Sequence, residues 1–106
     1  MSDIFSTRER IFESLFTHEL EVEYRTRARA DLYFGLWAAQ QLKMDDQEKI
    51  KQYALKLMES EAINIRRHID IVLADFVTAN IKLDRQDLLH QYTKFYQQAR
   101  AELKGK

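Results

Sequence analysis

The sequence predicts an all-α fold: a small four-helix bundle with a long first helix whose N-terminal part projects or is disordered when the protein is free. Three observations predict it. The chain has no proline and only two glycines, Gly35 and Gly105, so the usual breakers of helices are almost missing. Apolar residues recur at helical spacing through most of the chain. Finally, 106 residues fit one hydrophobic core and hence one domain.

The first helix is expected over residues 7–43, because nothing in this stretch forces a break and Ser6 or Thr7 can cap its start. At 1.5 Å per residue it reaches roughly 55 Å, whereas the other expected helices reach only about 18 to 30 Å. One end of this helix must therefore overhang the bundle.

The apolar residues of this helix also change side along its length. Those of the first half share one side: Ile4, Phe5, Ile11, Phe12, Leu15 and Phe16. Those of the second half are expected nearly opposite, as a core stripe: Tyr24, Ala28, Leu32, Leu36 and Ala39. We therefore expect an N-terminal docking segment, residues 1–20, that projects or stays disordered until a partner covers it, and a four-helix domain, residues 21–106. The alternative is a bend within residues 17–23 that folds the first half back.

The other three helices follow from turn residues and apolar stripes. Met44, Asp45 and Asp46 form the first turn, and the second helix carries Ile50, Tyr53, Ala54, Leu57 and Met58. A third is expected from about Ser60 to Ile81, with Ile65, Ile69, Val72, Leu73 and Phe76 on one side. Asp84 is expected to cap the fourth, whose stripe is Leu88, Leu89, Tyr92, Phe95, Tyr96, Ala99 and Leu103.

Composition excludes several classes of function. Basic and acidic residues balance at 17 each, which disfavours binding to nucleic acid. The absence of cysteine removes disulfides and thiolate sites and suits a reducing cytoplasm. The chain opens without the basic and apolar regions of a secretory signal, so export is not expected. The densest apolar run, residues 33–39, is far shorter than the roughly 20 residues that span a bilayer, so direct membrane insertion is not expected either.

The histidines are the obvious metal-ligand candidates, but the paired Glu-x-x-His spacing of di-iron bundles is missing. We expect His18, His68 and His90 to be solvated, with no metal site. Nothing in the pattern indicates a cofactor or a set of catalytic groups, so we do not expect an enzyme.

Within the first helix, arginines alternate with acids. Glu21 and Glu23 stand four residues before Arg25 and Arg27, which favours intrahelical ion pairs. The alternative is that these arginines and Arg29 form a patch for an acidic partner or a phosphate.

Gly35 sits in the middle of the same helix, where glycine costs up to about 1 kcal/mol relative to alanine. We expect it to mark a tight helix crossing, with Trp37 anchored in the core. Arg8 shares the side of Ile4, Ile11 and Phe12, so a helix docked by that side would carry its guanidinium into the interface. The alternative is that Arg8 extends to the rim.

A series of short segments between Phe5 and Ala39 resembles, in order and spacing, the zeta-type inhibitor subunit of alphaproteobacterial F-type ATP synthases. These segments are Arg8-Glu9-Arg10, Glu13, Phe16, His18, Glu21, Ala28-Arg29 and Gly35-x-Trp37-Ala38-Ala39. Weaker matches continue through Tyr53-Ala54 and Ala74-Asp75. The chain departs from the family pattern at Leu15, where lysine is usual, at Ala30, where arginine is usual, and in residues 62–67, where an acidic loop is usual.

The resemblance implies a regulatory inhibitor that binds the catalytic head of the ATP synthase. Its N-terminal segment would enter a catalytic interface against the central rotor stalk and block ATP hydrolysis. The partners would be the alpha, beta and gamma subunits, and the protein would be cytoplasmic, held peripherally at the inner membrane through the synthase, and monomeric when free. The partner-binding residues would be Ile4, Phe5, Arg8, Glu9, Arg10, Ile11, Phe12, Glu13, Leu15, Phe16 and His18. The alternative function is a helical adaptor, or a regulator that binds a small ligand in the bundle and does not inhibit the ATPase.

Overall fold

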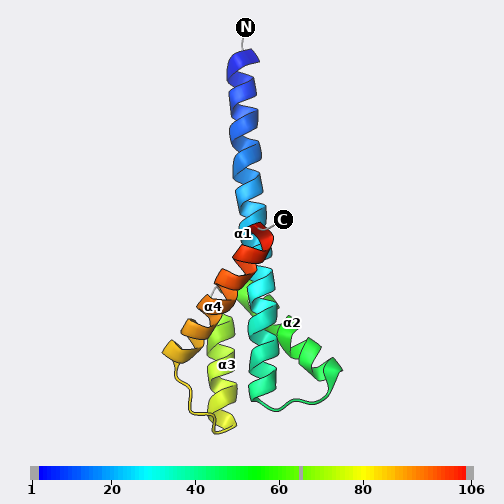
Figure 1. The fold of residues 1–106 in the computed structure, drawn as a ribbon, viewed down its shortest axis with the longest axis vertical. Helices are drawn as coiled ribbons and strands as arrows, with labels where there is room; N and C mark the ends of the chain where they lie inside the picture. Colours follow the sequence, from blue (N-terminus) through cyan, green and yellow to red (C-terminus); the bar gives the residue numbers. More distant parts are fainter. Residues whose placement is uncertain (1–2, 65, 105–106) are drawn as a thin grey trace.

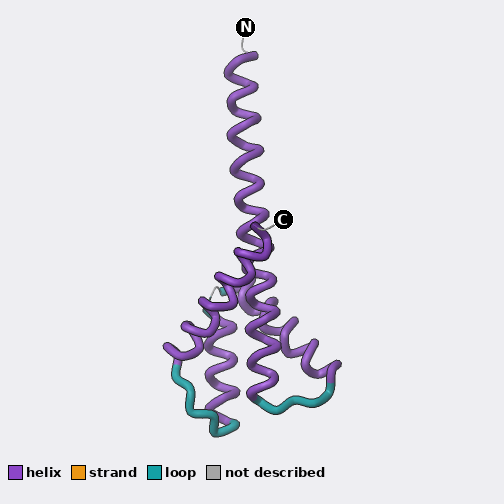
Figure 2. Tube along the Cα trace, in the orientation of Figure 1, coloured by secondary structure: helices purple, strands orange, loops and turns teal. Residues whose placement is uncertain are grey.

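The computed structural model describes residues 3–64 and 66–104, and the side chains of residues 19–61, 64 and 66–104. The described residues form four helices: α1 (Asp3–Gln41), α2 (Gln47–Ile63), α3 (Arg67–Thr78) and α4 (Arg85–Lys104). Figure 2 shows only helices and loops in this part of the chain, so the predicted all-α class is confirmed.

α1 is much longer than the other helices, with 39 residues. Its N-terminal half runs well beyond α2, α3 and α4 in Figure 1, and the molecule measures 67 × 23 × 21 Å. The expected projection is confirmed, and α1 continues through residues 17–23 in Figure 1 without folding back. The helix begins at Asp3, so Ser6 and Thr7 lie inside it and the expected start at Thr7 is wrong.

The end of α1 is set by a left-handed residue. Lys43 has φ 60°, its N–H donates to the Gln40 carbonyl at 3.0 Å, and the Met44 N–H donates to the Ala39 carbonyl at 3.1 Å. This pair of bonds is the Schellman pattern that satisfies the last carbonyls of a helix.

The starts of α2 and α4 are set by aspartates. The Glu48 N–H donates to Asp46 Oδ1 at 2.9 Å. At α4 the Asp87 N–H donates to Asp84 Oδ1 at 2.9 Å, and the Asp84 N–H donates to Asp87 Oδ2 at 3.0 Å. This reciprocal capping satisfies backbone donors that a helix start leaves open, and it confirms Asp84 as the cap.

The expected boundary between the second and third helices is wrong. α2 continues through Ser60, whose hydroxyl donates to the Leu57 carbonyl at 2.8 Å instead of capping a new helix. Asn64 ends α2 with φ −150°, and its side chain accepts the Arg66 N–H at 3.1 Å. α3 therefore begins at Arg67, and it ends at Thr78, before the expected Ile81, because Asn80 adopts φ 61°.

The expected stripes of α2, α3 and α4 do face the core. Their buried members are Tyr53, Ala54, Leu57, Ile69, Val72, Phe76, Leu88 and Ala99. Ile65, which was expected on the third stripe, lies outside the described residues. Trp37 is partly buried, with its ring 5.8 Å from Phe34 and 5.7 Å from Phe76. The expected tight crossing is confirmed at Gly35, where a Cβ atom would lie 2.7 Å from the Ala54 Cα.

The core side of α1 differs from the expected one. Tyr24 is 75% exposed, and Leu32 and Leu36 are 39% and 41% exposed. Ala39 is buried as expected, but the other buried residues of this segment are Thr26, Ala30, Asp31, Phe34, Gly35 and Ala38. The reason is that α1 packs against both α2 and α4, so small residues that let these helices approach fill most of its contact surface.

The burial of Ala30 and Phe34 also changes how the two halves of α1 are related. Residues 18 apart occupy the same position on a helix after about five turns. Phe12 is therefore in register with the buried Ala30, and Phe16 with the buried Phe34. The other four apolar residues of the first half are in register with partly buried positions of the second half. The two apolar sides therefore overlap instead of lying opposite, and the projection rests on the length of α1.

Candidate docking surface

Residues 3–18 of α1, which we call the arm, form the helical segment that extends beyond the other three helices (Figure 1). All the expected partner-binding residues lie in it, and their side chains lie outside the described part of the structure. They are Ile4, Phe5, Arg8, Glu9, Arg10, Ile11, Phe12, Glu13, Leu15, Phe16 and His18. The structure therefore gives the backbone register of these residues.

The base of the arm is held to α4 through Glu23. The Tyr96 hydroxyl donates to Glu23 Oε2 at 2.6 Å, and Arg100 Nη1 lies 3.7 Å from the same oxygen. On the other oxygen, Arg27 Nε donates at 3.0 Å, so the expected Glu23–Arg27 pair is confirmed. The hydrogen bond to Glu23 is also the main cause that raises the pKa of Tyr96.

A second cluster joins the middle of α1 to the end of α4. The Tyr33 hydroxyl donates to Glu102 Oε1 at 2.7 Å, and Arg29 Nη1 lies 3.6 Å from that oxygen. The hydrogen bond from Tyr33 is the main cause that lowers the pKa of Glu102. Arg29 thus has a partner 73 residues away, and these two clusters fix where α1 leaves the bundle.

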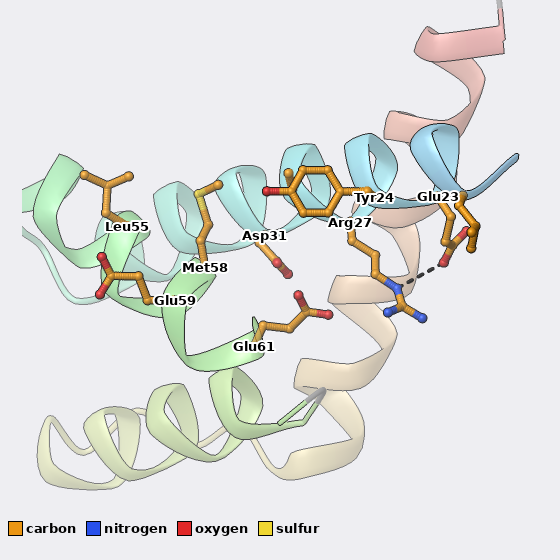
Figure 3. A pocket seen from close by; sticks show the side chains of 10 residues that line it. Glu23, Tyr24, Arg27, Asp31, Leu55, Met58, Glu59 and Glu61 are labelled. Carbon is orange, nitrogen blue, oxygen red and sulfur yellow. Dashed lines mark hydrogen bonds and ion pairs between the residues drawn. The ribbon is translucent and has the colours of Figure 1, made fainter. Parts of the chain in front are cut away.

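A groove lies between α1 and α2 next to the base of the arm (Figure 3). Its volume is about 760 Å³, within the usual range for binding sites. The residues that line it are Leu20, Glu23, Tyr24, Arg27, Ala28, Asp31, Leu55, Met58, Glu59 and Glu61. The sequence patterns did not predict this groove.

The floor of the groove holds a buried carboxyl group. Asp31 is 2% exposed, and its Oδ1 has no hydrogen-bond partner among the described residues. Figure 3 shows its carboxyl group pointing toward that of Glu61 on α2. Burial, and then the interaction with Glu61, raise the pKa of Asp31 to about 8. Asp31 therefore holds a proton at neutral pH.

His68 of α3 lies beneath this carboxyl group. Its ring is buried, 5.8 Å from Phe34 and 4.8 Å from Tyr92. Nε2 lies 3.8 Å from Asp31 Oδ1, which is too long for a hydrogen bond. Burial lowers the pKa of His68 to about 4, so the ring is neutral at physiological pH.

The three histidines that were expected to be solvated differ in their surroundings. His68 is not solvated as expected, because α3 places it on the core side; His90 is exposed, and His18 lies outside the described side chains. In the described part of the chain, no group of three or more histidine, aspartate or glutamate side chains is placed to hold a metal ion.

Comparison with known families decides the relationship. Residues 1–102 match the family described as ATPase inhibitor subunit zeta. The chain belongs to this inhibitor family. The match covers nearly the whole chain and confirms the resemblance seen in the sequence. Searches of curated proteins and of solved structures found no match.

Membership of the zeta family makes the protein an inhibitor subunit. Ala30 is fully buried in the core side of α1. An arginine there would have to bury its charge or displace a neighbouring helix. Among the described helices of this zeta-family member, none is long and apolar enough to cross a membrane.

Proposed function

We propose that this protein inhibits ATP hydrolysis by the F-type ATP synthase by inserting residues 1–20 at a catalytic interface of the head. The alpha, beta and gamma subunits are the partners, and residues 21–106 remain outside as the folded domain. The protein works in the cytoplasm, bound peripherally to the inner membrane through the synthase, and it catalyses no reaction itself.

The observation that carries this proposal is the arm. It continues the core side of α1 beyond the three helices that cover that side in the bundle, because Phe12 and Phe16 are in register with Ala30 and Phe34. A helix with one apolar side gains most of its stability by packing that side against other groups. A partner with a hydrophobic groove can supply this packing, which is a common mode of helix recognition.

Family membership identifies the kind of partner. An ATPase inhibitor subunit must contact the ATPase, and an extended helix is the part of this molecule that can reach into an interface between subunits. At 1.5 Å per residue the arm spans about 24 Å. The cluster at Glu23 supports insertion by holding the base of the arm to α4, and the cluster at Glu102 holds the middle of α1 to the same helix.

The test compares hydrolysis by the cognate ATPase with the full chain and with a chain that lacks residues 1–18. We expect the full chain to lower the rate and the shortened chain to leave it unchanged, while far-ultraviolet circular dichroism shows a folded bundle. Equal inhibition by both chains would refute insertion of the arm. No inhibition by the full chain, with a melting temperature that rises on adding a small ligand, would favour the alternative regulator.

A further inference from the structure

The groove beside the base of the arm combines apolar walls with an acidic floor. Leu20 and Tyr24 of α1 and Leu55 of α2 form its walls and are exposed large apolar side chains. Exposed apolar residues gathered at one place on a small protein commonly mark a surface that binds another molecule. The walls therefore suit an apolar chain.

The floor suits a positive charge. Asp31 Oδ1 is buried and has no hydrogen-bond partner among the described residues, and the Glu61 carboxyl group faces Asp31 (Figure 3). A buried polar atom without a hydrogen bond is costly and rare in folded proteins. A donor entering from the groove would satisfy this atom.

The described basic side chains near the floor do not supply that donor. Arg27 is engaged with Glu23 at 3.0 Å at the edge of the groove, as the dashed line in Figure 3 marks. His68 Nε2 is also without a hydrogen-bond partner among the described residues, but it stays 3.8 Å from Asp31 Oδ1, beyond hydrogen-bond distance. Burial lowers the pKa of His68 to about 4, so its ring carries no positive charge. On the side of the groove the carboxyl group of Glu61 is partly exposed, and the buried carboxyl group of Asp31 lies directly behind it.

We propose that this groove receives a lysine or arginine side chain of the ATPase head, whose alkyl stem lies along Leu20 and Met58 and whose cationic end bonds to Asp31. This inference rests on the proposed function. A protein partner is favoured over a free ligand because Leu20 and Tyr24 lie directly next to the arm, so a surface that encloses the arm continues over them. Tyr24 and Leu20 are also more than half exposed, which a small ligand on the floor would leave uncovered.

Binding of the cation is coupled to the proton on Asp31. The groups that face Asp31 come from all four helices: Arg27 of α1, Glu61 of α2, His68 of α3 and Tyr92 of α4. Tyr92 stays neutral because burial raises its pKa. Since the pKa of Asp31 is about 8, a cation binds best once this proton has left, and its affinity should rise about ten-fold from about pH 7 to about pH 9.

The first part of the experiment tests the groove alone. The probe is n-butylguanidinium and the receptor is the full chain. We expect saturable amide shifts at Ala28, Asp31 and Glu61 in nuclear magnetic resonance spectra, and none with n-butylurea, which has a similar shape without the charge. Asp31→Asn should weaken probe binding at least about ten-fold, while Glu48→Gln should not. Glu48 is the matched control because it removes one charge from α2 about 20 Å from Glu61. Absence of these shifts, or equal weakening by both variants, would overturn the cationic groove.

The second part of the experiment measures the affinity of the same variants for the isolated ATPase head at about pH 9, where Asp31 is ionised. We expect Asp31→Asn to weaken the complex about thirty-fold or more, since a buried charge pair that loses one member costs about 2 to 5 kcal/mol, and Glu48→Gln to leave it unchanged. If Asp31→Asn binds the head as well as the original chain, the assignment to the ATPase is overturned, and a groove that still binds the probe takes a free cation. If the original chain does not bind the head at all, the proposed function fails, while the probe titration still decides the groove.

Discussion

The two buried titratable groups beneath the groove predict an unusual dependence of stability on pH. The pKa of Asp31 is raised from 3.8 to about 8 in the folded protein, so between these values the folded state holds a proton that the unfolded state has released. The free energy of unfolding then falls by about 1.4 kcal/mol for each unit that the pH rises. His68 acts in the opposite sense, because its pKa is lowered from 6.5 to about 4 and the unfolded state binds the extra proton in that interval.

The two contributions cancel below pH 6.5, and above it Asp31 acts alone up to about pH 8. We therefore expect the free energy of unfolding to fall by about 2 kcal/mol from pH 6.5 to about pH 9, and then to level off. For a domain of this size the same change lowers the melting temperature by about 10 °C. The measurement is urea unfolding followed by far-ultraviolet circular dichroism at fixed ionic strength.

The matched variant is Asp31→Asn, which keeps the shape of the side chain and removes its titration. Its stability should be nearly constant over this interval and should exceed that of the original chain at the alkaline end. Glu48→Gln should retain the decline. A constant or rising stability in the original chain, or an unchanged decline in Asp31→Asn, would show that Asp31 does not hold the proton that its burial implies.

Three further predictions test the bundle and the arm. Gly35→Ala should lower the free energy of unfolding by about 1 to 2 kcal/mol, because a Cβ atom would lie 2.7 Å from the Ala54 Cα; unchanged urea midpoints would contradict the tight crossing. Arg8→Glu should weaken inhibition severely and Arg10→Glu far less, since Arg10 lies on the opposite side of the arm; equal inhibition constants would mean that the docking side is wrong. Amide hydrogens of residues 3–18 should exchange rapidly in the free protein and slowly in the complex with the ATPase, and protection in both states would argue against docking through the arm.

Local chemistry made much of the fold predictable. The cap at Asp84 depends on residues three apart in the sequence, so its chemistry is visible without a structure. The stripes of α2, α3 and α4 were also predictable, because each of these helices buries mainly one side. The junction after Ser60 was misplaced because the break is made by Asn64, whose side chain forms a local turn where the apolar pattern gives no warning.

The prediction of which side of α1 faces the core was wrong for a physical reason. Leu32 and Leu36 are more hydrophobic than Thr26 and Ala30, so a hydropathy pattern predicts that the leucines are buried. However, α1 packs against α2 and α4 on two sides, and the close approach of these helices requires small residues there. The sequence therefore predicted where the helix is most apolar, which is not where it is most buried.

The acidic groove was missed because its parts meet only in the folded chain. Asp31, Glu61 and His68 lie on three helices, and no spacing rule connects them. The available signal was Asp31 itself, an acid that directly follows Ala30 in an apolar stretch and that lies four residues after Arg27. That spacing suggests a surface ion pair, which Arg27 makes with Glu23 instead.

Because arm and bundle share one uninterrupted helix, the chain specifies an angle as well as a distance between them. One residue inserted near position 18 would advance the bundle by 1.5 Å and swing it by about 100° around the axis of α1. A partner that grips the arm would then face a different side of the bundle, and the groove would point away from it. Seven inserted residues, close to two whole turns, would move the bundle by about 10 Å with little rotation. The arm can therefore change in length only by whole helical turns if the bundle is to keep its orientation. The number of residues in the arm thus sets which side of the bundle faces the partner.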